Sequence, residues 1–399
     1  MAKQISSFSS SNNCILQLAK AVEDYLMWMI SADYASGTIM IHERLLNHFQ
    51  NFITNRNISW EQVFTYDTLN GFEKHCGLHF SANAVRGLSR YLFEQKLIPG
   101  PIKKPLSRLP EIYEYYLLYY EKTRQVHRSS LVQTRNVLSA LNDYLSKQDI
   151  DLAGIKIEQI DDFLSEFNAR FMPATCRYNR SYLRGFLRYL YFYRRILKRN
   201  LAPLIVGAPM FAQAQPPKFL RSDEVKALFA SLSSDICKEL RTSAMVHLGY
   251  TLGLRPKEIS LIRLDDISFV QGEINLFDRK SANPIKLPLP EITIKAIAAY
   301  IVGCRPESNH RALFLTFHAP VKPVTAATVG HDITVAMRKI NPLASAYWLR
   351  HTYAQNLLES GASIFEVKQM MGHDNVQSTK RYIHIHTKLM RKELFDETI

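Results

Sequence analysis

The sequence predicts a mainly α-helical, multidomain chain with a small β-hairpin or three-stranded sheet in its C-terminal part. Apolar residues recur at helical spacing through most of the 399 residues, a length that suits about two or three domains. Proline and glycine cluster at 99–110 and again at 202–217, where a chain leaves regular structure. One stretch, 268–289, alternates apolar and polar residues around a Gln271-Gly272 turn, which is typical of a hairpin.

The first two blocks have the pattern of one repeated helical unit. Arg86–Leu92 aligns with Arg184–Leu190, with five identical residues among seven, and the apolar pattern of 45–53 returns at 137–145. Each block is long enough for four or five short helices. We therefore predict a first helical domain over 1–104, a second over 105–205, a linker over 206–218 and a last domain over 219–399.

Positive charge is concentrated in the second block and the linker. The formal net charge is +14, and 167–222 holds eleven Lys or Arg residues but no Asp or Glu. Such a surface indicates a polyanionic partner, although a solvated basic face is the alternative. Arginines at helical spacing, with tyrosines between them, suit contact with double-stranded DNA: Arg177, Arg180, Arg184, Arg188, Arg195 and Arg199, with Arg86 and Arg90 as their counterparts in the first block.

Composition argues against several other classes of protein. No run of about 18 apolar residues occurs, so no membrane span is expected, and the N-terminus lacks the apolar block of a signal peptide. The five cysteines are widely spread and form no CxxC pair, which supports neither a disulfide framework nor a zinc site. We expect a cytoplasmic protein without cofactor or metal.

The C-terminal block contains three short motifs with the residues of a phosphate clamp and a nucleophile. They are Leu252–Glu258 with Arg255, Leu349–Thr352 with Arg350, and Met371–Tyr382 with His373. Arginine binds phosphate oxygens through a planar fork and keeps its proton. A tyrosine, whose free pKa is about 10, becomes a nucleophile when cations favour the phenolate or a base takes its proton.

These motifs resemble those of the tyrosine recombinases, the phage-integrase-like family, over 219–386. The resemblance implies that Arg255, Arg350 and His373 hold a DNA phosphate while Tyr382 attacks it. Glu258 stands where the family has a supporting carboxylate, although an ordinary acid in the first turn of a helix is the alternative. A hairpin-loop lysine protonates the leaving 5′ oxygen in this family, and Lys280 matches that position best, with Lys286 as the competitor.

Two features differ from the usual family pattern. Tyr347 stands where the family usually has a histidine, and a tyrosine mainly donates a hydrogen bond to phosphate rather than accepting a proton. Both helical blocks resemble the small SAM-like core-binding domain that precedes the catalytic domain in this family. One copy is usual, so the additional copy is a departure.

The resemblance predicts a site-specific DNA recombinase of a mobile element, of the integrase, transposase or resolvase type. It would work through a covalent 3′-phosphotyrosine as a homo-tetramer on two DNA sites, with accessory proteins, and associate with the nucleoid when bound. The amphipathic C-terminal tail would dock onto a neighbouring protomer or fold back onto its own domain. The alternatives are a type IB-like topoisomerase and a non-catalytic DNA-binding descendant.

Overall fold

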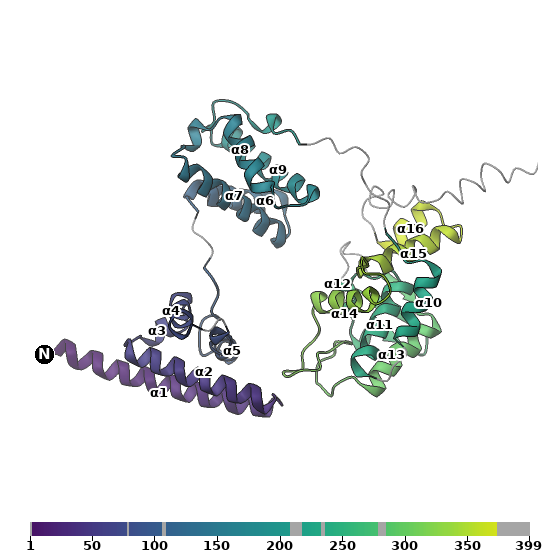
Figure 1. Ribbon diagram of the computed structural model, residues 1–399, viewed down its shortest axis with the longest axis horizontal. Helices are drawn as coiled ribbons and strands as arrows, with labels where there is room; N and C mark the ends of the chain where they lie inside the picture. Colours follow the sequence, from purple (N-terminus) through teal and green to yellow (C-terminus); the bar gives the residue numbers. More distant parts are fainter. Residues whose placement is uncertain are drawn as a thin grey trace, which may run out of the picture. The chain divides into compact units, whose positions relative to one another are not determined.

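The computed structural model describes residues 2–77, 80–105, 109–207, 218–232, 236–277 and 285–372, with side chains from Cys14 onward (Figure 1). Buried apolar residues of the described ranges form separate clusters along the chain: one over 14–98, one over 109–205, one over 220–349 and a smaller one over 354–371. Each part of the chain is described by itself below. The extents assigned to the three domains remain a proposal.

The N-terminal part is helical, with its core between a long first helix and four further helices. Its elements are α1 (Ala2–Ser31), α2 (Ser36–Asn55), α3 (Trp60–Val63), α4 (Tyr66–Cys76) and α5 (Ser81–Glu94). The apolar pattern of 45–53 explains how α2 packs, because its core positions Leu45, Leu46, Phe49, Phe52 and Ile53 are all buried.

The second part, Lys103–Gln213, forms a compact unit with the same order of elements. It contains α6 (Glu111–Arg124), α7 (Arg128–Lys147), η1 (Leu152–Gly154), α8 (Ile157–Asn168), α9 (Pro173–Arg188), the π-helical turn η2 (Tyr189–Tyr193) and η3 (Ala202–Leu204). Three apolar residues of α9 at helical spacing, Leu183, Phe186 and Leu187, are fully buried.

The aromatic packing of these two parts is the same, which supports an internal duplication. In the first part the Tyr91 ring lies 5.5 Å from Tyr25 and 5.3 Å from Trp28. In the second part the Tyr189 ring lies 5.3 Å from Tyr116 and 5.0 Å from Tyr119, at matching positions.

A glycine faces the same tyrosine hydroxyl in both copies. A Cβ placed on Gly87 would lie 2.4 Å from the hydroxyl of Tyr25, and one on Gly185 would lie 2.5 Å from that of Tyr116. The helices approach so closely that only glycine fits. The shared sequence pattern therefore reflects shared packing.

The C-terminal part is a helical domain with a small antiparallel sheet of order β1-β2-β3. Its elements are α10 (Ser222–Ser231), α11 (Cys237–Thr251), α12 (Pro256–Leu261), η4 (Leu264–Asp266), β1 (Ile267–Ser268), β2 (Glu273–Leu276), β3 (Ile285–Pro288), α13 (Glu291–Gly303), α14 (Ala326–Arg338), α15 (Tyr347–Glu359) and α16 (Ile364–Met371). In the sheet, Ile274 pairs with both Ile267 and Leu287 and is fully buried. The predicted fold class, mainly α-helical with this sheet, is confirmed.

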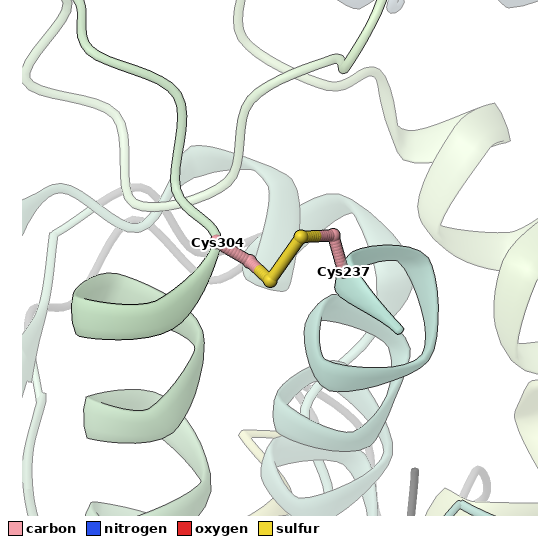
Figure 2. Close-up of a disulfide and its surroundings, with 2 residues drawn as sticks. All are labelled: Cys237 and Cys304. Atoms are coloured by element: carbon pink, nitrogen blue, oxygen red, sulfur yellow. A yellow bond between two sulfur atoms is a disulfide. The ribbon is translucent and has the colours of Figure 1, made fainter. Parts of the chain in front are cut away.

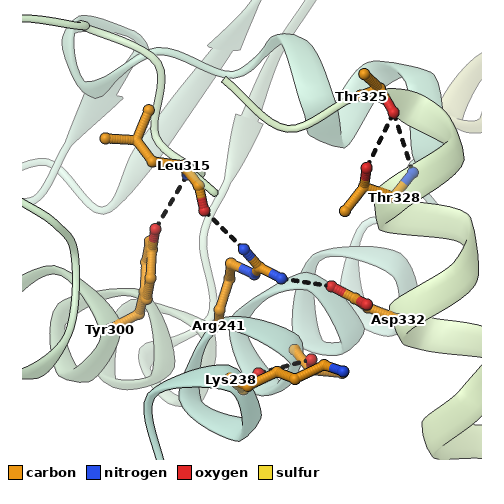
Figure 3. Close-up of polar contacts among 8 residues, drawn as sticks. Lys238, Arg241, Tyr300, Leu315, Thr325, Thr328 and Asp332 are labelled. Carbon is orange, nitrogen blue, oxygen red and sulfur yellow. Dashed lines mark hydrogen bonds and ion pairs between the residues drawn. The ribbon is translucent and has the colours of Figure 1, made fainter. Parts of the chain in front are cut away.

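A buried ion pair fastens α11 to α14 in this part (Figure 3). The Arg241 guanidinium donates to a carboxylate oxygen of Asp332 and to the carbonyl of Leu315, both at 2.7 Å. The Tyr300 hydroxyl accepts from the Leu315 amide at 3.1 Å. A charged group buried this deeply requires partners. For Arg241 they come from α14, through Asp332, and from the segment between α13 and α14, through the Leu315 carbonyl.

Two predictions made from the sequence were wrong, one about the cysteines and one about the arginines of the second helical part. Cys237 and Cys304 form a disulfide that joins the start of α11 to the end of α13 (Figure 2), because the two helices pack side by side and bring their ends together. The arginine series does not follow one helix either. The α-helix ends at Arg188, the π-helical turn follows, and Arg195 has a φ of 52°. Arg195 and Arg199 therefore lie outside the helix that carries the others.

Candidate active site

Arg255 lies at the junction between α11 and α12. Gly253, with a φ of +62°, turns the chain after α11, and Pro256 is the first residue of α12, where its missing N–H is not needed. A Cβ on Gly253 would lie 2.4 Å from the ring of Tyr353, so glycine is needed for both the turn and the packing. The sequence places Arg255 at the start of this helix correctly.

The Glu258 carboxylate holds Arg255 in two ways. One oxygen accepts from the Arg255 backbone amide and the other from its guanidinium, each at 2.8 Å. Glu258 is therefore both the acid that caps the first turn of α12 and the ion-pair partner of the arginine, so the two alternatives of the sequence analysis coexist. The Arg255 side chain is 20% exposed.

Arg350 reaches the same carboxylate from another helix. Its guanidinium lies 3.9 Å from the Glu258 oxygen that accepts from the Arg255 backbone amide, and both side chains are almost fully buried. It also donates to the carbonyls of Gly253 and Met371, each at 2.5 Å. These bonds orient the guanidinium and connect α15 to the α11–α12 turn and to the end of α16.

The resulting arrangement is a buried carboxylate with a guanidinium on either side. Two cations this close repel each other unless an anion lies between them, and Glu258 supplies that charge. The two arginines carry one positive charge in excess of the carboxylate. This excess of positive charge favours an additional oxyanion beside the two guanidinium groups.

Helix α15 is anchored at its second turn as well. Leu220, at the entry to the C-terminal part, donates its backbone amide to the Thr352 hydroxyl at 3.0 Å, and this contact is buried. Thr352 lies two residues after Arg350. The beginning of this part of the chain therefore helps to fix the helix that carries the second arginine.

Of the remaining candidate site residues, the structure describes Tyr347 and Lys286. Tyr347 is the first residue of α15 and is 56% exposed. Lys286 lies on β3 and pairs with Glu273 across the sheet at 2.5 Å. Lys280, His373 and Tyr382 lie outside the described residues.

Comparison with known proteins identifies the family. The phage integrase family model matches residues 218–388. The chain is 28% identical over 320 residues to a Sinorhizobium fredii (strain NBRC 101917 / NGR234) protein named as an integrase/recombinase, y4rA, covering 77% of this chain and 76% of that one. It is 25% identical over 288 residues to the tyrosine recombinase XerC of Staphylococcus aureus (strain bovine RF122 / ET3-1), covering 70% of this chain and 94% of that one.

The chain belongs to the tyrosine recombinase family. It is an enzyme of this type. Its fold agrees with solved structures. The XerH site-specific recombinase bound to palindromic difH substrate has a TM-score of 0.57 at 14% identity, covering 96% of each chain. The Tn1549 transposon integrase bound to transposon right end DNA has a TM-score of 0.55 at 15% identity, covering 71% of this chain and 99% of that one.

The predicted DNA-contact arginines of this tyrosine recombinase differ in their exposure to solvent. Arg184 donates twice to the carbonyl of Ile205, and a Cβ on Gly207 would collide with the Arg180 guanidinium. Arg86 lies 3.8 Å from Glu73. The other predicted DNA-contact arginines are exposed: Arg90, Arg177, Arg188, Arg195 and Arg199. Helical spacing alone does not separate the two groups.

Proposed function

We propose that this tyrosine recombinase is a site-specific DNA recombinase of a mobile element that breaks and rejoins strands through a covalent 3′-phosphotyrosine at Tyr382. The observation that carries the proposal is the Glu258 carboxylate, which lies within 3.9 Å of both the Arg255 and the Arg350 guanidinium groups. It brings together two arginines that are 95 residues apart in the sequence (350 − 255 = 95). Such a pair neutralises the charge that develops on a phosphodiester under attack.

In the proposed first step, the Tyr382 phenolate oxygen forms a bond to phosphorus and the bond to the 5′ oxygen breaks. Lys280 gives its proton to that leaving oxygen, and Lys286 is the less suitable acid because it already pairs with Glu273. The phosphotyrosine then retains the energy of the broken bond. A 5′ hydroxyl from a second duplex attacks the phosphorus in the reverse sense and displaces Tyr382, so neither ATP nor a metal is required.

The bond from Arg350 to the Met371 carbonyl supports a common site for the three motifs. Met371 ends α16, and His373 follows two residues later. The arginine that would bind the phosphate thus also holds the start of the segment that leads to His373 and Tyr382. In the proposal, His373 and Tyr347 donate hydrogen bonds to non-bridging oxygens.

The helical parts would hold the DNA. We propose that the chain divides into the domains 1–104, 105–205 and 219–399, and that both helical domains contact double-stranded DNA through the exposed arginines. Four protomers on two sites would complete strand exchange, with the C-terminal tail, which lies outside the described residues, linking neighbours.

We place the protein in the cytoplasm. In the described part of the chain no helix is long and apolar enough to cross a membrane.

A nicked duplex that releases the short leaving strand tests this function. With such a substrate we expect the wild-type protein to form a covalent complex and then to join the captured strand to a second duplex that presents a 5′ hydroxyl. Tyr382→Phe should neither form the covalent complex nor join the strand. Tyr178→Phe, which changes an exposed tyrosine of the second helical part, should still form the complex and join the strand.

The alternatives give different results in the same experiment. A topoisomerase would reseal its own strand and leave the second duplex unjoined. A non-catalytic descendant would form no covalent complex, and this result would remove the proposal.

A further inference from the structure

A cavity of about 520 Å³ lies in the second helical part, and none of the residues of the proposed active site lines it. This volume falls within the range of ligand pockets, about 300–1,000 Å³. Its walls combine aromatic rings with cations: Tyr119, Tyr120 and Arg124 from α6, and Arg188, Phe192 and Tyr193 from the end of α9 and the π-helical turn. Among the described residues, those that line it include no carboxylate.

The aromatic side of the cavity is built by the π-helical turn Tyr189–Tyr193. Short π-helical turns are rare and occur frequently at functional sites. The Phe192 and Tyr193 side chains are 59% and 63% exposed, although burial would stabilise rings of this size. The Tyr193 ring lies 4.8 Å from that of Tyr119, and the Phe192 ring lies 4.8 Å from that of Tyr191. Each exposed ring therefore packs against a neighbouring aromatic ring.

The cationic side of the cavity comes from Arg124 and Arg188, which are both exposed. Within the described ranges, neither guanidinium forms an ion pair. Arg184, which also lines the cavity, donates instead to the Ile205 carbonyl. Two arginines without carboxylate partners at the edge of an aromatic cavity favour an anionic ligand with a flat, apolar portion.

The duplicated part of the chain shows that this cavity is not required by the fold. Both copies share the aromatic packing and the glycine, but α5 continues as an α-helix to Glu94, where the second copy has the π-helical turn. The positions that match Arg124, Phe192 and Tyr193 hold Asp33, Glu94 and Gln95. Arg124 and the exposed rings are thus particular to the second copy, where a core-packing role does not explain them, whereas Arg188 matches Arg90 of the first copy.

We propose that this cavity binds one unpaired nucleotide of a DNA strand, with the base stacked on the Phe192 and Tyr193 rings and the phosphate on Arg124 and Arg188. Every base has a face that stacks on an aromatic ring, and arginine supplies the contact to the backbone. The inference rests on the proposed function in one respect, that the ligand is DNA. Exchange of strands between duplexes separates base pairs near the break, and such a site would hold a base that has left its partner.

Binding of two probes by the full-length protein tests this inference. The first probe is a fluorescent oligothymidylate of about ten nucleotides, and the second is a fully paired duplex, both followed by fluorescence anisotropy at fixed salt. The double variant Arg124→Gln/Tyr193→Ala should weaken oligothymidylate binding by about fivefold to a hundredfold, the loss that removal of a stacking ring produces. Its affinity for the duplex should stay within about twofold.

The matched control is Tyr115→Ala/Arg128→Gln. It removes one tyrosine and one arginine from the same helical part, and Tyr115 is 46% exposed, but neither residue lines the cavity. This control should bind oligothymidylate as the wild type does. Should the first double variant fail to fold, the wild type can be photo-crosslinked to a single strand that contains 5-iodouracil. Adducts within 119–124 or 188–193 would support binding of a nucleotide in the cavity. Adducts elsewhere would oppose it.

The other outcomes separate this inference from the proposed function. A wild type that binds the duplex but not oligothymidylate overturns the cavity proposal and leaves the recombinase proposal intact. Equal loss of both probes in the variant also overturns it, because the residues would then form a duplex-binding surface. Failure of the wild type to form a covalent complex with nicked DNA would instead count against the proposed function.

Discussion

Glu258→Gln is the substitution that probes the arginine pair most directly. The glutamine keeps the shape of the side chain and one acceptor oxygen, but it replaces the other oxygen with an NH₂ group that faces donors. The variant loses the charge between Arg255 and Arg350 and one of two 2.8 Å hydrogen bonds. Breaking a buried ion pair costs about 3–5 kcal/mol. We expect about 3 kcal/mol, because the Arg255 side chain is 20% exposed.

The effect on cleavage should be larger than the loss of stability implies. Without the carboxylate the two guanidinium groups repel each other and move apart, and a displacement of about 1 Å at a reacting centre can cost about a hundredfold in rate. We therefore expect the single-turnover rate of covalent-complex formation on a nicked duplex to fall at least about a hundredfold under conditions where the variant is folded. Urea unfolding measures the stability separately.

Asp332→Asn provides the matched control, because it breaks the buried pair between Arg241 and Asp332 in the same part of the chain. It should also lower the free energy of unfolding by about 3 kcal/mol. Once folded, however, it should cleave near the wild-type rate. A Glu258→Gln protein that cleaves within about threefold of wild type, or an Asp332→Asn protein that loses as much activity, would refute the reasoning.

Three further predictions concern the framework of the site. Gly253→Ala should destabilise by about 1–2 kcal/mol in urea unfolding, because alanine at positive φ is strained and its Cβ meets Tyr353; full stability would contradict the packing. Reduction of the Cys237–Cys304 disulfide, which spans 67 residues, should lower the unfolding free energy by up to about 4 kcal/mol, and a double serine variant should not respond to reductant. Burial lowers the pKa of His247 below its ordinary value of 6.5, so the unfolded chain takes up a proton that the folded chain refuses; stability should fall as pH drops below about 6.5, and more steeply than in His247→Gln.

Sequence alone predicts those parts of the structure that depend on local spacing. The buried residues of α9 follow from apolar periodicity, and the place of Arg255 follows from Gly253 and Pro256, which end one helix and begin the next. Spacing did not reveal where α9 stops. Arginines continue at helical intervals beyond Arg188, but the end of the helix depends on where the rings of Tyr189–Tyr193 pack, which is decided by α6.

The features that sequence reasoning missed depend on which segments meet in space. The disulfide joins residues 67 positions apart and has no local signature. The burial of Arg255 depends on the approach of α15, because Arg350 shares its carboxylate. Arg241 gives no sign in the sequence that Asp332 will face it. In the cavity of the second helical part, the single clue was the departure of Arg124, Phe192 and Tyr193 from their counterparts in the first copy.

The most direct test of the account is to identify the atom that carries the DNA after cleavage. The covalent complex with nicked duplex can be digested with protease and nuclease, and the modified peptide sequenced by mass spectrometry. The account predicts a 3′-linked phosphate on Tyr382 in the wild type and no adduct in Arg350→Ala. A nucleotide on another residue, or a linkage through the 5′ phosphate, would contradict it.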